Sequence, residues 1–279
     1  MSRTAWLNAL LACAVAALAV FAYLKPRTGV APEYAVAPAA TGEARSIRIE
    51  RPDAAPIVLE KREGGWAMTA PLAARADELR VQRLLAIPGA KASSRLAATD
   101  LARFELDRPA ARVIIDGRQF DFGIVTALSR EQYLLTGGAV YTVGLQYGAA
   151  LPARPADLID KRPLSPAEMP VRFEFTGYTV AQDGGKWVLK PPGGELSQDD
   201  YQRWVDGWRH ASALRVEPYA KGKPVAEMRV ELRNGAKLAF GELAREPETA
   251  LLRSDEKLVY YFVREAGQRL LAPPGSTRQ

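Results

Sequence analysis

The sequence repeats an ordered set of turn and strand residues, and this duplication constrains the fold more than any other feature. A Gly-Gly pair, a Trp and a Pro occur twice in the same order, at Gly64, Gly65, Trp66 and Pro71 and again at Gly184, Gly185, Trp187 and Pro191. A second block returns at a constant offset of 118 residues, so that segment 114–123 matches 232–241. Two copies of one pattern must bury their apolar residues in the same way, so the sequence predicts two similar subdomains.

The first copy is predicted to hold two strands, a helix and about four further strands. Residues 57–66 are typical of a single second strand. Asp77 is the expected N-cap of a helix that ends near Ile87. Asp-Gly at 116–117 and Gly-Gly at 137–138 are the expected hairpin turns.

The second copy predicts the same order of elements. Ser197 followed by Asp200 is a capping-box pattern with Asp in place of the preferred Glu, and Asn234-Gly235 is the strongest hairpin signal of the chain. Local connections of this kind favour antiparallel sheets. The predicted fold class is therefore α+β, with two tandem, similar subdomains that each have a mainly antiparallel sheet and one covering helix. Whether the two sheets join stays open.

Residues 5–24 form an uncharged run of 20 residues with Asn8 as its one polar side chain. At about 1.5 Å per helical residue the run would span about 30 Å, the thickness of a bilayer core. We expect an uncleaved transmembrane anchor, with a cleaved signal peptide ending near 17–19 and a lipoprotein signal at Cys13 as alternatives. The charges before and after the run nearly balance, but its two-residue charged stub is typical of a signal anchor. We therefore expect a single-pass inner-membrane protein with most of the chain on the periplasmic side.

The remaining organisation follows from composition. The predicted parts are a transmembrane anchor at 1–24, a Pro- and Ala-rich linker at 25–45, a first repeat at 46–165, a second repeat at 166–273 and a tail at 274–279. The linker prolines disfavour a helix and favour an extended tether. With 38 Lys and Arg scattered among 32 Asp and Glu, the net charge of +6 indicates a mixed solvated surface, so no nucleic-acid partner is expected.

Catalytic motifs are not evident. The one histidine, His210, has no nucleophile and orienting carboxylate near it in sequence, so a structural or surface role is expected. With Cys13 the only cysteine, a zinc site is not expected, and Asp199, Asp200 and Asp206 lack the spacing of a calcium loop. We expect no catalytic residue and no cofactor. A hydrolase with a carboxylate pair is kept as an alternative, because two strands could bring such acids together.

The aromatic residues Tyr201, Trp204 and Trp208 lie on one stripe of the second predicted helix. A stripe at this spacing usually faces the sheet, which favours the core. The same rings could instead stack on a sugar or anchor a partner, so they are the candidate binding surface. A glycan- or peptidoglycan-binding module is therefore an alternative function.

Several diffuse motifs resemble a family of uncharacterised bacterial proteins, the domain of unknown function numbered 4340. They are Leu59-Glu60-Lys61, Gly65-Trp66, Pro71, Ala76-Asp77-Glu78, Asp100-Leu101, Phe104-Glu105-Leu106-Asp107-Arg108-Pro109, Val140-Tyr141-Thr142-Val143, Asp157-Leu158 and Lys161-Arg162-Pro163-Leu164. One departure is Glu105, where the family usually has Gly, so an altered turn is expected there. The resemblance implies a membrane-anchored envelope protein, often auxiliary to an ABC-type transport system of the gliding-motility type, and it carries over no catalytic residue. The expected function is a non-enzymatic binding or scaffold component with protein partners in a membrane complex.

Overall fold

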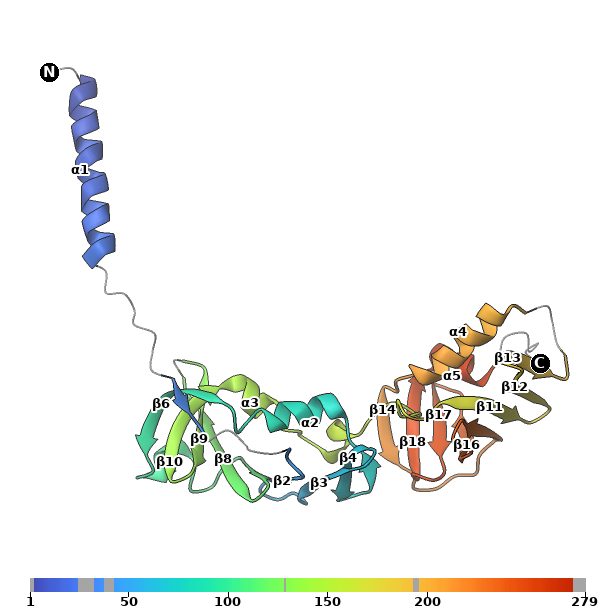
Figure 1. Ribbon diagram of the computed structural model, residues 1–279. Coiled ribbons are helices and arrows are strands. Elements are labelled where there is room, and N and C mark those ends of the chain that lie inside the picture. The colour runs from blue at the N-terminus through green and yellow to red at the C-terminus, as the bar shows by residue number, and fades with distance from the viewer. Residues whose placement is uncertain (1–2, 25–32, 38–42, 128, 193–195, 273–279) are drawn as a thin grey trace.

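The computed structural model describes residues 3–24, 33–37, 43–127, 129–192 and 196–272. The predicted tail 274–279 and much of the predicted linker 25–45 lie outside these residues. Two sheet-and-helix units lie end to end, and the N-terminal helix stands apart from them (Figure 1).

The first unit is a ten-stranded antiparallel sheet with the order β1-β6-β10-β9-β8-β7-β2-β3-β4-β5. Its strands are β1 (Tyr34–Ala35), β2 (Ser46–Glu50), β3 (Ile57–Arg62), β4 (Gly65–Ala70), β5 (Ala74–Arg75), β6 (Lys91–Ala97), β7 (Ala111–Ile115), β8 (Arg118–Val125), β9 (Glu131–Thr136) and β10 (Ala139–Gly144). Its helices are α2 (Glu78–Leu85) and α3 (Leu145–Ala149), with short 3-10 helices η1 (Leu101–Phe104) and η2 (Pro155–Leu158).

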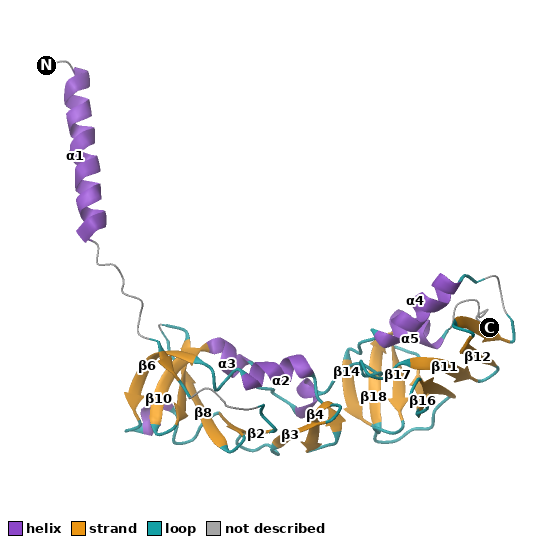
Figure 2. Ribbon diagram, in the orientation of Figure 1, coloured by secondary structure: helices purple, strands orange, loops and turns teal. Residues whose placement is uncertain are grey.

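The second unit is an eight-stranded antiparallel sheet with the order β13-β12-β11-β15-β16-β17-β18-β14. Its strands are β11 (Pro170–Phe175), β12 (Tyr178–Asp183), β13 (Lys186–Lys190), β14 (Arg215–Pro218), β15 (Ala226–Leu232), β16 (Lys237–Ala244), β17 (Glu248–Arg253) and β18 (Leu258–Val263). Its helices are α4 (Gln198–Arg209) and α5 (Arg264–Leu271). Helices α2, α3, α4 and α5 lie on the same side of the two sheets (Figure 2).

The two sheets share one topology. Read from β6 to β4, the first sheet has the strand order that the second has from β14 to β13, and β1 and β5 are additions to its two edges. The repeated Trp residues have the same contact in both units: Trp66 N donates to Glu78 Oε1 over 2.9 Å, and Trp187 N donates to Gln198 Oε1 over 2.8 Å. Each acceptor is the first residue of the helix that follows. Pro71 and its repeat both follow cis peptide bonds.

The structure confirms a mixed α+β fold with two antiparallel sheets and corrects two details. The prediction of one helix per subdomain was wrong, because α3 and α5 follow the last hairpin of each unit. The five residues of α3 are too few to show a helical period in sequence. The prediction of a single strand over 57–66 was also wrong, since a turn at Glu63 and Gly64 reverses the chain between β3 and β4.

The local turn and cap signals were more successful. Asp77 caps α2 by accepting from Leu79 N and Arg80 N, and the capping box of Ser197 and Asp200 forms at α4. The turn at 116–117 is a two-residue hairpin in which both residues have positive φ. The turn around Asn234-Gly235 is one residue longer than the turn at 116–117, because Leu232 N donates to the Ala236 carbonyl across it.

A loop crosses the outer face of each sheet at a repeated glycine. In the first unit, Phe104 and Leu106 cover a small cluster around Val140, and a Cβ on Gly123 would lie 2.2 Å from the Phe104 carbonyl oxygen. In the second unit, a Cβ on Gly241 would lie 2.6 Å from Cγ of the proline that crosses there. The recurrence of this glycine at an offset of 118 residues therefore has a steric cause.

Glu105 follows η1 in the left-handed conformation, with φ 53° and ψ 37°. The turn thus has the conformation that glycine adopts without steric cost, although the residue is glutamate. We expect Glu105→Gly to raise the free energy of unfolding by about 1 kcal/mol, because left-handed strain at a non-glycine residue is removed. Chemical denaturation checks this expectation, with Glu105→Ala as the control that keeps the Cβ. A loss of stability in Glu105→Gly would contradict it.

The N-terminal helix α1 runs from Arg3 to Leu24. Its large apolar side chains are solvent-exposed at Trp6, Leu10, Leu11, Val15, Leu18, Val20 and Phe21. Within the part of the chain that the structure describes, no helix meets the combined length and hydropathy that a membrane crossing requires.

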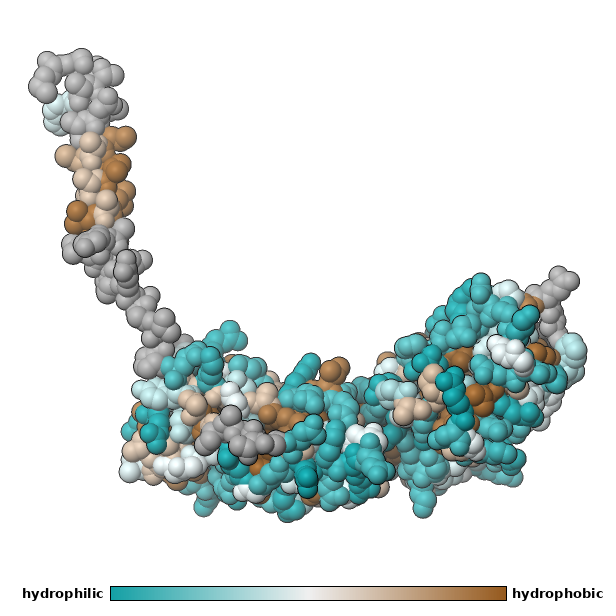
Figure 3. All heavy atoms as spheres, in the orientation of Figure 1, coloured by the Kyte–Doolittle hydropathy of each residue, from teal (hydrophilic) through white to brown (hydrophobic). Residues whose placement is uncertain are grey.

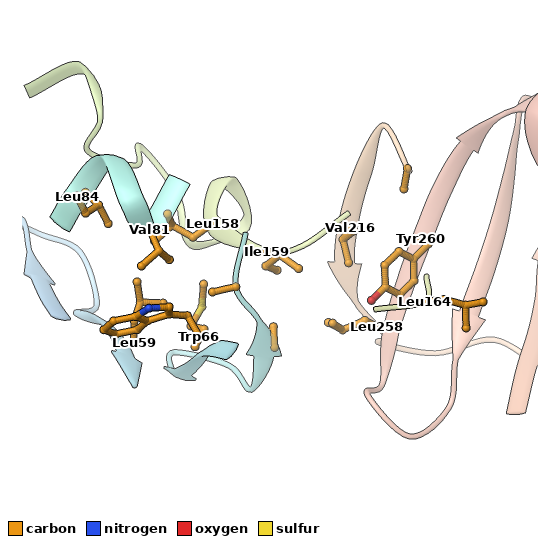
Figure 4. Close-up of a cluster of buried hydrophobic side chains, with 14 of the residues drawn as sticks. Leu59, Trp66, Val81, Leu84, Leu158, Ile159, Leu164, Val216, Leu258 and Tyr260 are labelled. Carbon is orange, nitrogen blue, oxygen red and sulfur yellow. The ribbon is translucent and has the colours of Figure 1, made fainter. Parts of the chain in front are cut away.

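A four-residue bridging segment, Leu158–Lys161, joins the two sheets without merging them. On one side, Asp77 N donates to the Leu158 carbonyl and Asp160 N donates to the Arg75 carbonyl. On the other side, Ala213 N donates to the Lys161 carbonyl just before β14. A single hydrophobic core continues across this joint, with Ile159 of the bridging segment lying between the two units (Figure 4). The sheets therefore stay separate but are held edge to edge through one extended segment.

Candidate functional site

Around the bridging segment lies a cluster of six charged side chains and one tyrosine from both units, here named the ionic joint: Arg75, Asp160, Arg162, Glu168, Arg253, Glu256 and Tyr260. Arg75 is its centre in the first unit. The Arg75 guanidinium donates to Glu256 Oε1 over 2.6 Å, to Asp160 Oδ2 over 3.2 Å and to Tyr260 Oη over 3.0 Å. Arg75 thereby ties β5 to residues near the β17–β18 turn, about 180 positions away in sequence.

Arg253 is the centre of the ionic joint in the second unit and is 3% exposed. Its guanidinium forms a two-pronged ion pair with Glu168, with distances of 2.8 and 2.5 Å, and also donates to the Pro163 carbonyl over 2.7 Å. Burial alone would raise the pKa of the Glu168 carboxyl, but hydrogen bonds from Arg253 and from Ser165 N outweigh burial and hold this pKa below its ordinary value. The segment after the bridging segment is therefore fixed to the second sheet by charge-assisted bonds.

A polar cleft of about 550 Å³ lies beside the ionic joint and is here named the inter-unit cleft. It is lined by the start of α2, the chain from Asp160 to Glu168 and the end of α4 with Ser212. Most of its charges already have partners: Asp77 caps α2, Asp160 binds Arg162, and Lys161 Nζ donates to the Leu214 carbonyl. The charged groups named here therefore already have hydrogen-bond partners within the chain.

His210 is the C-cap of α4 and lines the inter-unit cleft. Its side chain is exposed, and Nδ1 lies 2.9 Å from the Asp206 carbonyl oxygen. Among the described residues, no group of three His, Cys, Asp or Glu side chains has the arrangement of a metal site. The calcium-loop residues considered in the sequence serve the helix itself, since Asp200 closes the capping box and Asp206 pairs with Arg209 over 3.3 Å.

Tyr201, Trp204 and Trp208 lie on the buried face of α4, where they belong to the main core. Trp208 is fully buried, and its Nε1 donates to the Leu270 carbonyl over 2.9 Å. Trp204 is 9% exposed, and its Nε1 donates to the Arg269 carbonyl over 3.0 Å. Both indole N–H groups thus fasten α4 to α5. Of the three rings, Trp204 also lines a surface hollow.

This hollow is a groove of about 450 Å³ between α4 and α5, here named the α4–α5 groove. The buried rings of Trp204 and Phe262 and the side chain of Leu270 line it. Small residues along it are Gly207 of α4, Ala211 just after that helix and Ala266 of α5, and its charged residues are Asp200, Arg203 and Arg269. Apolar surface is visible around these helices on an otherwise hydrophilic unit (Figure 3). A lining of this kind suits an apolar side chain of another molecule.

Of the residues named for the α4–α5 groove and the ionic joint, the sequence interpretation identified Trp204 as a candidate and missed the others. Gly207 lies on the face of α4 next to the aromatic stripe, so a helical wheel could have shown this small side of the groove. No such signal exists for the ionic joint. Arg75 and Glu256 meet only because two separately folded sheets are placed edge to edge.

The comparisons with known proteins give one match. Residues 66–235, more than half of the 279-residue chain, match the family described as Domain of unknown function (DUF4340). The matched range begins in β4 and ends in the β15–β16 turn, so it includes the bridging segment and parts of both sheets. Neither the curated proteins nor the solved structures gave a match. The chain belongs to the family described as Domain of unknown function (DUF4340).

Proposed function

We propose that this protein is a membrane-anchored envelope component that binds or scaffolds partner proteins without transforming them. In this proposal, residues 5–24 hold the chain in the inner membrane and the two units lie on the periplasmic side. The partners are subunits of an ABC-type transport complex, the association that the family resemblance implies.

The anchor proposal is supported by the 20-residue uncharged run and by the exposed apolar side chains of α1. An isolated helix with leucines, valines and Phe21 exposed along its length leaves apolar area in water. Burial of such side chains in lipid contributes about 1.5–3 kcal/mol each. This is the energetic reason to assign α1 to a membrane.

The scaffold proposal is supported chiefly by one observation, the presence of the open α4–α5 groove on a body whose two units are joined by paired charges. The ionic joint and the shared core disfavour bending between the units. A rigid body with an apolar groove can present that groove to a partner at low entropic cost. The alternative of a glycan-binding module depended in part on exposed tryptophan rings. It is disfavoured because Trp208 is fully buried.

A site-specific photocrosslinking experiment in intact cells tests the proposal. A photoreactive amino acid is placed at Ser212, an exposed position that lines the groove, and in a control chain at Glu63 in the exposed β3–β4 turn. We expect the chain in the inner-membrane fraction, degradation of its body by protease added to spheroplasts, and crosslinks from Ser212 to transport-complex subunits. A chain free in the cytosol, or crosslinks to cytoplasmic proteins alone, would refute the proposal.

A further inference from the structure

A short part of the predicted linker is bound to the first unit as strand β1. β1 lies beside the edge strand β6, at the end of the first unit that is nearest to α1 (Figure 1). The two strands form an antiparallel ladder in which Tyr34 lies opposite Ala92. Directly after β1, Val36 N donates to the Ala90 carbonyl over 3.2 Å. Residues of the linker thus form the outermost strand of the sheet.

Side chains on either side of β1 add to the backbone ladder. Val36 is 4% exposed and belongs to the main hydrophobic core, and Ala37 packs against the same core. Just before β1, Glu33 pairs with Lys91 Nζ over 2.7 Å at the surface. Buried apolar contacts stabilise more than exposed ion pairs do. Val36 is therefore the residue that chiefly holds β1 in place.

The position of β1 limits how far the first unit can lie from α1. α1 ends at Leu24, and the eight residues 25–32 separate it from Glu33. Because each residue of a fully extended chain advances by at most about 3.3–3.6 Å, eight residues span at most about 30 Å. This limit holds while β1 stays bound to β6.

Detachment of β1 would raise this limit. A later fixed point of the chain is Arg45, whose backbone N donates to Asp116 Oδ1 over 3.0 Å. The twenty residues 25–44 lie between α1 and Arg45, and they span at most about 70 Å. The bound strand therefore shortens the largest possible separation by more than half.

Detachment of β1 would also leave the other strands of the sheet paired. β1 is the end strand of the sheet order and pairs with β6 alone. Its ladder with β6 has two residue pairs among the described residues. β6 is also paired with β10 along residues 139–143, on its other side. Release of β1 thus removes few contacts and does not require the unit to unfold.

We propose that β1 is a releasable strap that fastens the linker to β6 and keeps the first unit within about 30 Å of the end of α1. The closeness to a membrane rests on the proposed anchoring by α1, whereas the strap itself does not. With the strap bound, a partner that contacts the first unit has to lie close to the bilayer surface. With the strap released, the same unit reaches partners farther away.

Val36→Asp is the releasing variant. Burial of a carboxylate in an apolar core is costly, and detachment of β1 returns the carboxylate to water. Ala35→Asp is the control, because Ala35 is exposed and lies opposite Lys91. The two variants add the same charge at neighbouring positions of one strand, so a difference between them reports on the buried contact.

Pulsed electron paramagnetic resonance on the full-length chain in lipid nanodiscs measures the separation. One spin label is on Cys13 of α1, and the other is on Ala102→Cys, an exposed position of η1. We expect Val36→Asp to shift the distances upward and about double the width of their distribution, because the largest span more than doubles. Ala35→Asp should keep the distribution of the unchanged chain. Circular dichroism should show a folded body in all three chains.

Disulfide trapping tests the strap without a releasing variant. In a chain with Cys13→Ser, the pair Ala35→Cys and Lys91→Cys places two thiols on directly opposed residues. The pair Ala35→Cys and Arg95→Cys is the control, with the second thiol four positions farther along β6. We expect the first pair to oxidise at least about ten-fold faster, because a disulfide requires closely placed Cβ atoms.

Equal oxidation of the two cysteine pairs would overturn the proposal, and so would a distance distribution that Val36→Asp leaves unchanged. Loss of the folded body in Val36→Asp would contradict a strap that can be released. A chain that does not insert into nanodiscs but shows the expected disulfide trapping would refute the proposed anchor and leave the strap standing.

Discussion

Replacing Gly123 by alanine is expected to lower the free energy of unfolding by about 3 kcal/mol. A Cβ at this position would lie 2.2 Å from the carbonyl oxygen of Phe104, and backbone cannot move aside as a flexible side chain can. The loop that carries Phe104 would have to leave the outer face of the first sheet. The small cluster around Val140 would then be opened to water. Loss of this cluster adds to the steric cost.

Urea denaturation followed by circular dichroism measures the effect of Gly123→Ala. The matched control is Gly64→Ala, because Gly64 is exposed, lacks positive φ and has nothing within 4 Å of the place that a Cβ would take. We expect the control to change the stability by less than about 0.5 kcal/mol. Gly241→Ala should also lower the stability, because a Cβ there would lie 2.6 Å from Cγ of Pro224, a ring side chain rather than a backbone oxygen. Equal stabilities of Gly123→Ala and the control would show that the loop packing has been misread.

Arg253→Met is the second substitution with a large expected effect, a loss of about 3–5 kcal/mol. The change removes both hydrogen bonds to Glu168 and leaves that carboxylate largely buried without its partner. It also removes the donor to the Pro163 carbonyl. A methionine of similar length keeps most of the packing, so the loss reports on the charge. The exposed pair of Arg62 and Glu60 supplies the control, since Arg62→Met should cost less than about 1 kcal/mol.

The pH dependence of stability gives an independent check on the same ion pair. Because the folded-state pKa of Glu168 is held below its unfolded value, the stabilisation is complete above the unfolded pKa and is lost as the pH falls through the folded pKa. The stability difference between the unchanged chain and Arg253→Met should therefore shrink on acidification. Thermal unfolding across the acid range measures it. A difference that grows with falling pH would refute the assigned role of Glu168.

The sequence was informative where a few neighbouring residues decide the structure. The Asp77 cap, the Ser197 capping box and the turn at 116–117 depend on contacts within four residues, and each formed as predicted. The repeated spacing also indicated that one arrangement occurs twice. The recurrence of Gly123 as Gly241 was visible, although its steric cause became clear only from the loops that cross it.

The candidate site was much less predictable. The stripe of tryptophans on α4 favoured the core but also fitted a binding surface, and only the position of α5 shows that their N–H groups are occupied. The groove exists because two helices more than 50 positions apart in sequence lie side by side. The ionic joint depends in the same way on the docking of two sheets. A single sequence carries no signal for distances of this kind.

The bridging segment has a geometric consequence for anything that the second unit holds. Backbone hydrogen bonds hold this segment to the first unit on one side and to the second unit on the other. The orientation of α4 relative to the first sheet therefore depends on the backbone conformation of the segment. We therefore expect the angle between the two units to stay constant. In the proposed scaffold, a partner bound at the second unit would keep a fixed orientation relative to the first unit.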